Sequence, residues 1–286
     1  MSIKVSTKVK LLAGRILYYS VRVLNALRGV TSTQIRCTRG GILWELELRE
    51  GIDLSIFCFG RFERDTSKAL ERIIKPGMVV VDIGANIGAH TLPIAKHVGE
   101  TGRVFAIEPT SFAYSKLSRN IDLNPSLKSR IVTVNAAFVS DTSQELGKIY
   151  ASWRLTGTDN AHSVHGGVEC DTSQAQRVTF DSFVAQAQIK KISVIKLDVD
   201  GFETHVLKGG LEALRRDHPT IVMEFSPYVH KEHGATFDEV VNILTDLGYG
   251  FECERTGKPL PSDVKELEAI IPAGGGINVI ARPDIS

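Results

Sequence analysis

The sequence predicts an α/β fold built on a mainly parallel sheet, and three observations support this prediction. Strand-like apolar runs alternate with helical patterns from residue 78 onward. The first of these runs, residues 78–83, is almost entirely apolar, as expected of a strand buried on both faces. With 43% hydrophobic and 23% charged residues among 286, the composition is that of a globular protein and excludes a mostly disordered chain. The apolar runs are far shorter than the ~20 residues that a membrane-spanning helix needs.

Residues 1–30 are predicted to form a basic amphipathic helix, because Lys8, Arg15 and Arg22 recur every seven positions among leucine, isoleucine and valine. Residues 1–44 carry eight basic and no acidic residues (+8), which leaves 26 basic and 33 acidic residues (−7) for the rest of the chain. Such a helix either packs on the main domain or a second subunit, or lies on an anionic membrane surface. A secretory signal is a further alternative, although charges interrupt its apolar part and no small-residue cleavage site follows.

Residues 31–77 are predicted to form an extension made of a β-hairpin and a helix. Apolar residues alternate with polar ones on both sides of the turn signal Glu50-Gly51, which predicts a hairpin over residues 42–59. A helical pattern over residues 67–74 follows, and a proline and a glycine end it.

Residues 78–286 are predicted to form the main domain. The expected strands span residues 78–83, 103–107, 131–134, 193–197, 221–225, 249–253 and 276–281. The expected helices span residues 88–98, 111–120, 203–216 and 237–247. Residues 140–177 interrupt this alternation and are too long for a plain connection. Trp153, His162 and His165 in this stretch either shape a substrate pocket or are ordinary loop residues.

The strongest local signal is the motif DIGANIG at residues 82–88, where a buried strand ends in an acid and a glycine turn opens a helix. We expect Gly84 and Gly88 to let a ligand approach the backbone, and free N–H groups at the helix start to favour an anionic group. A dinucleotide site would need GxGxxG, whereas Asn86 stands where the middle glycine would be. The Asp82 carboxylate suits a ligand that has an ammonium group, or it pairs with the loop amides. A plain strand-to-helix turn is the alternative.

Glu108 ends the second strand, 24 residues after Gly84. In nucleotide-binding α/β folds an acid at this position accepts hydrogen bonds from both ribose hydroxyls. A ligand that combines an amino acid, ribose and adenine is S-adenosylmethionine, which we therefore predict as the cofactor. The backbone of Ala136, just after the third strand, is expected to contact the adenine.

Together these motifs resemble the FkbM family of S-adenosylmethionine-dependent methyltransferases. The resemblance rests on DIGANIG at residues 82–88, Glu108-Pro109, KLDVDGFE at residues 196–203 and MEF at residues 223–225, and it extends to GRFE at residues 60–63. It implies a Rossmann-like class I methyltransferase sheet of seven strands with the last strand antiparallel, preceded here by the N-terminal helix and hairpin. It also places Glu63 among the cofactor-binding residues. Asp200 departs from the family, which often has glutamate there.

The acids of KLDVDGFE are the catalytic candidates. Asp198 ends a strand at the edge where ligands bind in open α/β sheets, and Asp200 follows it. Crowded carboxylates raise one another's pKa, as a general base requires. We predict that Asp198 or Asp200 accepts a hydroxyl proton, with His205 as a further candidate, and we expect no metal. In one alternative an Asp caps the next helix, and in another these acids and Glu224 hold magnesium.

We therefore predict a methyltransferase that O-methylates a hydroxyl of a sugar, a glycolipid or a secondary metabolite; the oxygen acceptor is implied by the family resemblance. The alternatives are a non-catalytic membrane-associated scaffold on the same fold and a nicotinamide-dependent dehydrogenase. A net charge of +1 argues against a nucleic-acid partner. Four scattered cysteines suit a reducing compartment, so we expect a protein that is either free in the cytoplasm or peripheral at the inner membrane surface.

Overall fold

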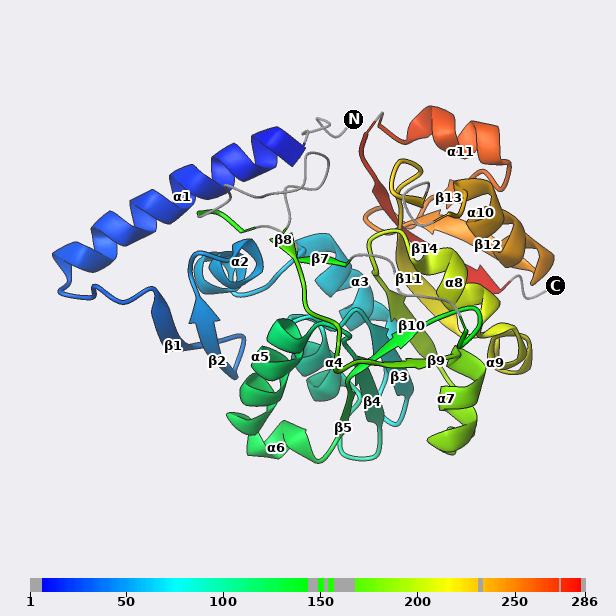
Figure 1. The fold of residues 1–286 in the computed structure, drawn as a ribbon, viewed down its shortest axis with the longest axis horizontal. Helices are drawn as coiled ribbons and strands as arrows, with labels where there is room; N and C mark the ends of the chain where they lie inside the picture. The colour runs from blue at the N-terminus through cyan, green and yellow to red at the C-terminus, as the bar shows by residue number, and fades with distance from the viewer. Residues whose placement is uncertain are drawn as a thin grey trace.

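The computed structural model describes residues 7–143, 149–151, 154–156, 168–230, 234–272 and 274–283. Its centre is an eight-stranded sheet in the order β13-β12-β14-β11-β10-β3-β4-β5 (Figure 1). The strands from β11 to β5 run parallel, whereas β14 runs antiparallel to both β11 and β12. The strands are β3 (Val79–Ile83), β4 (Arg103–Ile107), β5 (Ile131–Val134), β10 (Val194–Leu197), β11 (Thr220–Phe225), β12 (Tyr249–Cys253), β13 (Pro259–Leu260) and β14 (Ile277–Pro283).

The seven predicted strands are all present, so the Rossmann-like sheet with a reversed last strand is confirmed. The two-residue β13 adds an eighth strand at the edge of the sheet by pairing with β12. Outside the sheet lie three further strand pairs, β1–β2, β6–β9 and β7–β8. Their bounds are β1 (Gln34–Arg39), β2 (Ile42–Glu47), β6 (Ala136–Phe138), β7 (Tyr150–Ala151), β8 (Val168–Glu169) and β9 (Gln176–Val178).

Helices cover both faces of the sheet because alternate strand residues enter two separate cores. In β3, Val81 and Ile83 pack into one core and Val80 into the other. The first core is closed by α7–α10 and the second by α2–α5. The helices are α1 (Thr7–Leu27), α2 (Gly51–Phe59), α3 (Arg64–Ile73), α4 (Thr91–His97), α5 (Ser111–Asp122), α6 (Pro125–Lys128), α7 (Phe180–Gln186), α8 (Glu203–Lys208), α9 (Leu211–Asp217), α10 (Phe237–Asp246) and α11 (Val264–Ile270).

The predicted hairpin over residues 42–59 is wrong in its position. The hairpin is β1–β2, which turns at Gly40-Gly41, and residues 51–59 form the helix α2. Two apolar groups bury opposite sides of α2: Ile52 and Ile56 pack into the core under the sheet, and Leu54 packs against α1. A helix that is apolar on two sides imitates the alternation of a strand, and this misled the prediction.

The predicted single helix over residues 203–216 is also corrected, because it is two helices, α8 and α9, separated at Gly209-Gly210. A Cβ at Gly209 would lie 2.3 Å from the carbonyl oxygen of Val139, and one at Gly210 would lie 2.4 Å from the Phe180 ring. The chain therefore needs two glycines where β6 and α7 pass close to it.

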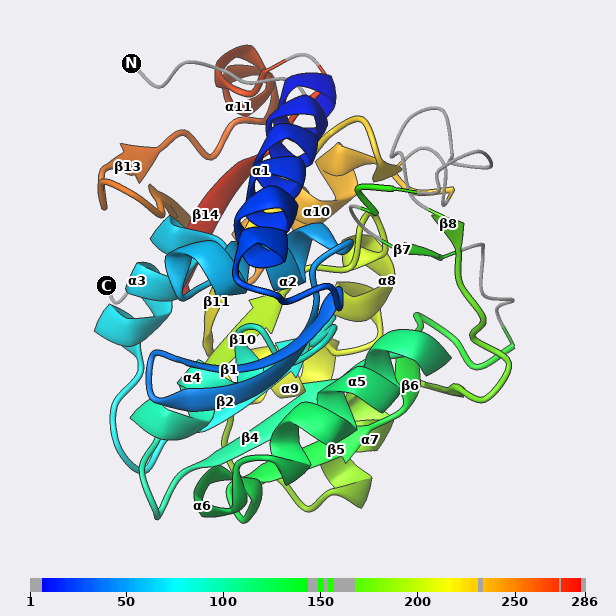
Figure 2. The same cartoon turned by 90° about the vertical axis from the view of Figure 1, so that its left-hand side faces the viewer.

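The predicted N-terminal helix is present as α1, which lies along the outer side of α2 (Figure 2). Its residues Tyr18 and Val21 are buried in a small cluster with Leu48, Leu54 and Leu155. The helix therefore packs on its own chain through one face. No helix in the part of the chain described here is long and apolar enough to cross a membrane.

The loops that follow the neighbouring strands β3 and β10 touch each other at Gly84. Gly84 has a φ of +81°, and a Cβ there would lie 1.9 Å from the carbonyl oxygen of Asp198. A side chain is thus excluded at this position both by backbone conformation and by space.

We expect Gly84→Ala to lower the free energy of unfolding by at least about 2 kcal/mol more than Gly248→Ala. Gly248 has a similar φ of +76° but open space around it, so both variants carry the backbone cost of ~1–2 kcal/mol and only the first adds a clash. Chemical denaturation measures both. Equal losses would contradict the close approach of the two loops.

Candidate active site

The predicted site residues follow the carboxyl ends of adjacent parallel strands. Asp82 lies in β3, Glu108 follows β4 and Asp198 follows β10, and these three strands are neighbours in the sheet. The structure therefore brings them to one edge, the edge where open α/β sheets bind ligands.

Lys196 connects the tips of β3 and β10. Its ammonium donates to Asp198 Oδ2 at 3.1 Å and to the carbonyl of Gly84 at 3.2 Å, and it lies 3.8 Å from Asp82 Oδ1. Burial alone would lower the pKa of Lys196, but the nearby carboxylates, led by Asp198, outweigh burial and raise it. The side chain therefore stays charged.

Asp82 is completely buried and is held by its own chain. Its Oδ2 accepts a hydrogen bond from the Thr91 hydroxyl at 2.6 Å, and its Oδ1 faces Lys196. The ammonium that Asp82 meets in this structure is thus a lysine. A direct role of Asp82 in cofactor binding stays a prediction.

The N–H groups of the glycine loop from Gly84 to Gly88 are not free. Gly84 and Ala85 both donate to the carbonyl of Ile107, and Asn86 donates to Glu108 Oε2 at 2.9 Å. Ile87 donates to the Asn86 side chain, and Gly88 to the carbonyl of Ala85. The helix α4 begins only at Thr91. The loop from Gly84 to Gly88 therefore satisfies its own donors, and an anion site at the start of α4 stays a prediction.

Glu108 is buried and keeps one acceptor position open. Its Oε1 accepts from the N–H and the hydroxyl of Thr110, and its Oε2 accepts from the N–H of Asn86. Since each carboxylate oxygen has about two acceptor sites, Oε2 can take one more donor. Burial raises the pKa of Glu108. The geometry fits one ribose hydroxyl, whereas the sequence suggested two.

The expected adenine side of the site is organised by Asn135. Its side-chain amide donates to the carbonyls of Glu108 at 2.8 Å and Pro109 at 3.2 Å, which ties the tips of β4 and β5 together. Ala136 follows directly, is fully buried, and pairs with Gln176 of β9. A backbone contact between Ala136 and adenine stays a prediction.

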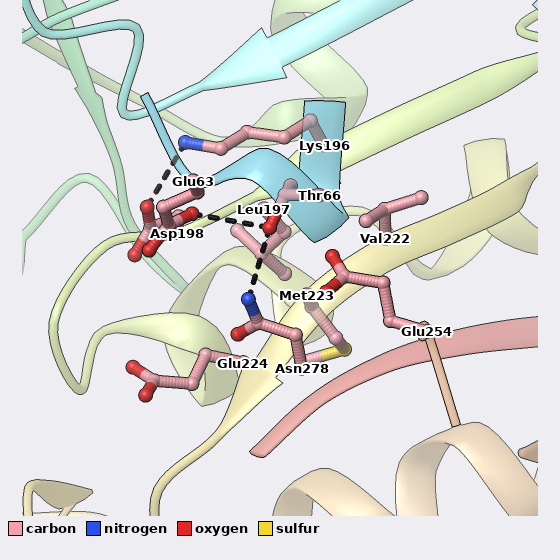
Figure 3. Close-up of a pocket in the computed structure, with 10 residues that line it drawn as sticks. All are labelled: Glu63, Thr66, Lys196, Leu197, Asp198, Val222, Met223, Glu224, Glu254 and Asn278. Carbon is pink, nitrogen blue, oxygen red and sulfur yellow. Dashed lines mark hydrogen bonds and ion pairs between the residues drawn. The ribbon is translucent and has the colours of Figure 1, made fainter. Parts of the chain in front are cut away.

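A pocket opens beside Asp198, on the side of β10 that faces β11 and β14 (Figure 3). We call it the acidic pocket, because four of the residues that line it are carboxylates. Its lining consists of Glu63, Thr66, Lys196, Leu197, Asp198, Val222, Met223, Glu224, Glu254 and Asn278. The predicted residues Glu63 and Asp198 therefore lie together in this pocket, while Glu108 does not line it.

Two carboxyls of the acidic pocket have pKa values raised to neutral pH or above. Burial raises the pKa of Glu224 to about 8, and the charges of Asp198, Asp200 and Glu63 add to the shift. Burial also raises the pKa of Glu254 to about 7. For Glu63, burial acts in the same direction, but nearby His90 and Lys196 outweigh it and lower the pKa.

The other catalytic candidates lie outside the lining of the acidic pocket. Asp200 is exposed and has a φ of +48°, yet its charge still acts on Glu224. The Nδ1 of His205 lies 3.5 Å from the Ser140 hydroxyl. Glu203 is buried, and burial together with Asp200 and Asp198 raises its pKa to about 8. It accepts a hydrogen bond from the N–H of Val199 and so closes the loop after β10.

Sequence reasoning missed Thr66, Asn278 and Glu254 as lining residues. A signal existed for Glu254, because it directly follows β12, another strand that ends at the same edge. No local signal marks Thr66 or Asn278. Trp153, His162 and His165 lie outside the described residues. In the described part of the chain, no three His, Cys, Asp or Glu side chains are grouped to hold a metal ion.

The fold and the edge site define a Rossmann-like protein of the class I methyltransferase type. The model of the methyltransferase FkbM domain matches residues 82–251, which is more than half of the chain. The chain belongs to the FkbM methyltransferase family, and the predicted membership is confirmed. Its cofactor is therefore S-adenosylmethionine.

Two curated relatives match parts of the chain. Hexuronic acid methyltransferase AglP of Haloferax volcanii is 30% identical over 162 residues, which covers 57% of this chain and 62% of the relative. Methyltransferase sdnD of Sordaria araneosa is 28% identical over 155 residues, which covers 46% of this chain and 59% of the relative. The chain thus spans about three fifths of these relatives. The solved structure of methyltransferase FkbM from Methylobacillus flagellatus is 16% identical with a TM-score of 0.44, over 75% of this chain and 50% of that one.

The residues at the edge fit the cofactor in two respects. Glu108 offers a buried carboxylate with one open acceptor position, which suits a hydroxyl donor. Asp198 is about a third exposed, at 35% of its side chain, and its carboxylate suits a positively charged group. The glycine loop itself offers no free donor for a carboxylate.

We expect Glu224→Gln to stabilise the protein at pH 9 by at least about 1 kcal/mol and to have little effect at pH 4.5. The folded state keeps the Glu224 proton up to a pH of about 8, whereas the unfolded chain loses it near the usual 4.5. The free energy of unfolding of the wild type therefore decreases as the pH rises from about 4.5 to about 8, by up to ~1.4 kcal/mol per pH unit. The variant has no proton to lose at this position, so its free energy of unfolding lacks this decrease.

Denaturant titrations at both pH values measure the difference. Glu252→Gln is the matched control. Glu252 is a partly exposed carboxylate that pairs with Arg282 at 3.1 Å. A gain at pH 9 that Glu252→Gln reproduces would contradict the assignment to a buried, unpaired carboxyl.

Proposed function

We propose that this protein transfers a methyl group from S-adenosylmethionine to a hydroxyl oxygen of a sugar, a glycolipid or a secondary metabolite. The observation that carries the proposal is the position of Asp198. It follows β10, which lies between β3, the strand that precedes the glycine loop, and β11, which borders the acidic pocket. A carboxylate between a donor side and an open pocket is well placed to meet the acceptor hydroxyl.

The chain's own groups would bind and orient the reactants, because in-line displacement depends mainly on positioning. Bound S-adenosylmethionine supplies an electrophilic methyl group; the new bond joins that carbon to the acceptor oxygen as the sulfur–carbon bond breaks. Asp198 would accept or orient the hydroxyl proton, with its carboxylate held in place by Lys196. Asp200 and His205 stay candidates for the same proton. Glu63 and Glu108 would bind the donor.

The name of the relative AglP supports a sugar as one acceptor class, since it specifies a hexuronic acid for that protein. Family membership argues against the nicotinamide-dependent dehydrogenase. A non-catalytic scaffold need not bind S-adenosylmethionine, so a binding measurement distinguishes it from a methyltransferase.

We expect Glu108→Gln to raise the Kd for S-adenosylmethionine by roughly 10- to 100-fold, because a hydrogen bond to a charged group is worth about 1.5–3 kcal/mol. Calorimetry measures it, with Glu100→Gln on the exposed end of the next loop as the control.

Mass spectrometry of an extract incubated with deuterium-labelled S-adenosylmethionine then detects the methylated product. A wild-type protein that binds no S-adenosylmethionine would establish the scaffold instead.

We propose further that α1 holds the protein against the inner surface of the cytoplasmic membrane. One face of α1 packs on α2, and the opposite face leaves large apolar side chains in solvent. Leu12, Ile16, Tyr19, Val23 and Leu27 are each at least half exposed and recur at helical spacing. The surrounding residues 1–44 carry a charge of +8, which favours anionic lipid headgroups.

We expect the double substitution Ile16→Glu and Val23→Glu to reduce flotation with anionic vesicles by roughly tenfold, since burying each side chain contributes about 1.5–3 kcal/mol. The assay compares vesicles of phosphatidylserine with vesicles of phosphatidylcholine alone. Ile270→Glu, at an exposed apolar position on α11, is the matched control. Equal flotation of the wild type and the double variant would rule out this surface.

A further inference from the structure

The acidic pocket has an excess of carboxylates over cations. Its lining holds four acids and a single ammonium, that of Lys196. Lys196 is already shared among Asp198, the carbonyl of Gly84 and Asp82. Its charge therefore balances Asp198 and Asp82, and no other residue that lines the pocket is positively charged.

Glu254 on that far side is buried and keeps an oxygen without a partner. The residue is 4% exposed, and its Oε1 accepts no hydrogen bond. Figure 3 shows its carboxyl directed toward Thr66 and Asn278. The Asn278 amide donates to the Thr66 hydroxyl at 2.9 Å, which in turn donates to Glu63 at 3.2 Å. The Thr66 hydroxyl is thus used by Glu63, and Glu254 Oε1 is an oxygen of a lining residue that lacks a donor.

Glu224 is the second acid without a counterion. Neither Glu224 nor Glu254 forms an ion pair with a basic side chain within the described residues. A buried acceptor that finds no donor costs about 1–3 kcal/mol, and a ligand donor would recover that cost. A positively charged group in the pocket would favour the ionised forms of Glu224 and Glu254, whose pKa values burial raises, so its binding would release protons.

We propose that the acidic pocket binds the methyl acceptor through an ammonium group, so that the acceptor is an amino-bearing hydroxyl compound such as an amino sugar or an amino alcohol. An ammonium group has three donors, so it can serve the open oxygen of Glu254 and further acceptors of the lining. Asp198, at the mouth of the same pocket, then faces the neighbouring hydroxyl. This inference rests on the proposed function, and it narrows the acceptor class by charge: an anionic sugar would be repelled by the same carboxylates.

The test compares three sugars of nearly the same shape and different charge: glucosamine, glucose and glucuronate. Calorimetry at pH 7 and constant ionic strength measures each, with S-adenosylhomocysteine present and absent. We expect the wild type to bind glucosamine at least tenfold more tightly than glucose or glucuronate. Glu254→Gln and Glu224→Gln should each weaken glucosamine binding at least fivefold and leave the Kd of S-adenosylmethionine within twofold. Glu252→Gln, whose carboxylate pairs with Arg282, should behave as the wild type.

Three results would overturn the inference: no preference for glucosamine, unchanged glucosamine binding by both pocket variants, or a tenfold loss of S-adenosylmethionine binding in either variant. The last result would assign the pocket to the ammonium of the donor itself. If the proposed function is wrong, the wild-type protein will not bind S-adenosylmethionine. Failure of this inference appears in a protein that does bind it.

Discussion

The whole site depends on one buried ammonium, that of Lys196. It stands among two carboxylates and a backbone carbonyl, and so it fixes the loops after β3 and β10 relative to each other. Asp82 is fully buried, so removing its positive partner would leave a charge stranded in the core, a change that typically costs about 3–5 kcal/mol. The position of Asp198, and with it the geometry of the pocket, follows from this interaction.

The sheet could be predicted because its signals are local. Each strand of the main domain is a short apolar run, and helical patterns separate the runs. The predictions failed where tertiary packing replaced a local rule. α2 is apolar on two sides because α1 covers one of them, and the break between α8 and α9 exists because other segments pass close to Gly209 and Gly210. Neither neighbour can be recognised in the sequence of the segment itself.

The residues of the site likewise include some that local motifs predict and some that only tertiary packing brings in. Asp82, Glu108 and Asp198 follow strands in short motifs, and their gathering at one edge follows from parallel topology alone. Thr66 comes from a helix before the sheet, and Asn278 from its antiparallel last strand, so only the folded chain brings them to the pocket. The hydrogen bonds from Gly84, Ala85 and Asn86 were also beyond prediction, because their acceptors lie at the tip of β4.

That self-contained loop has a consequence for how the donor is received. Since every N–H from Gly84 to Gly88 already has an acceptor in the protein, the loop keeps its shape whether or not a ligand is present. Little conformational entropy remains to be lost there on association, so this wall of the site acts as a rigid template. Any adjustment of the site on binding therefore falls to the acidic pocket, whose side chains come from α3, β10, β11, β14 and the end of β12.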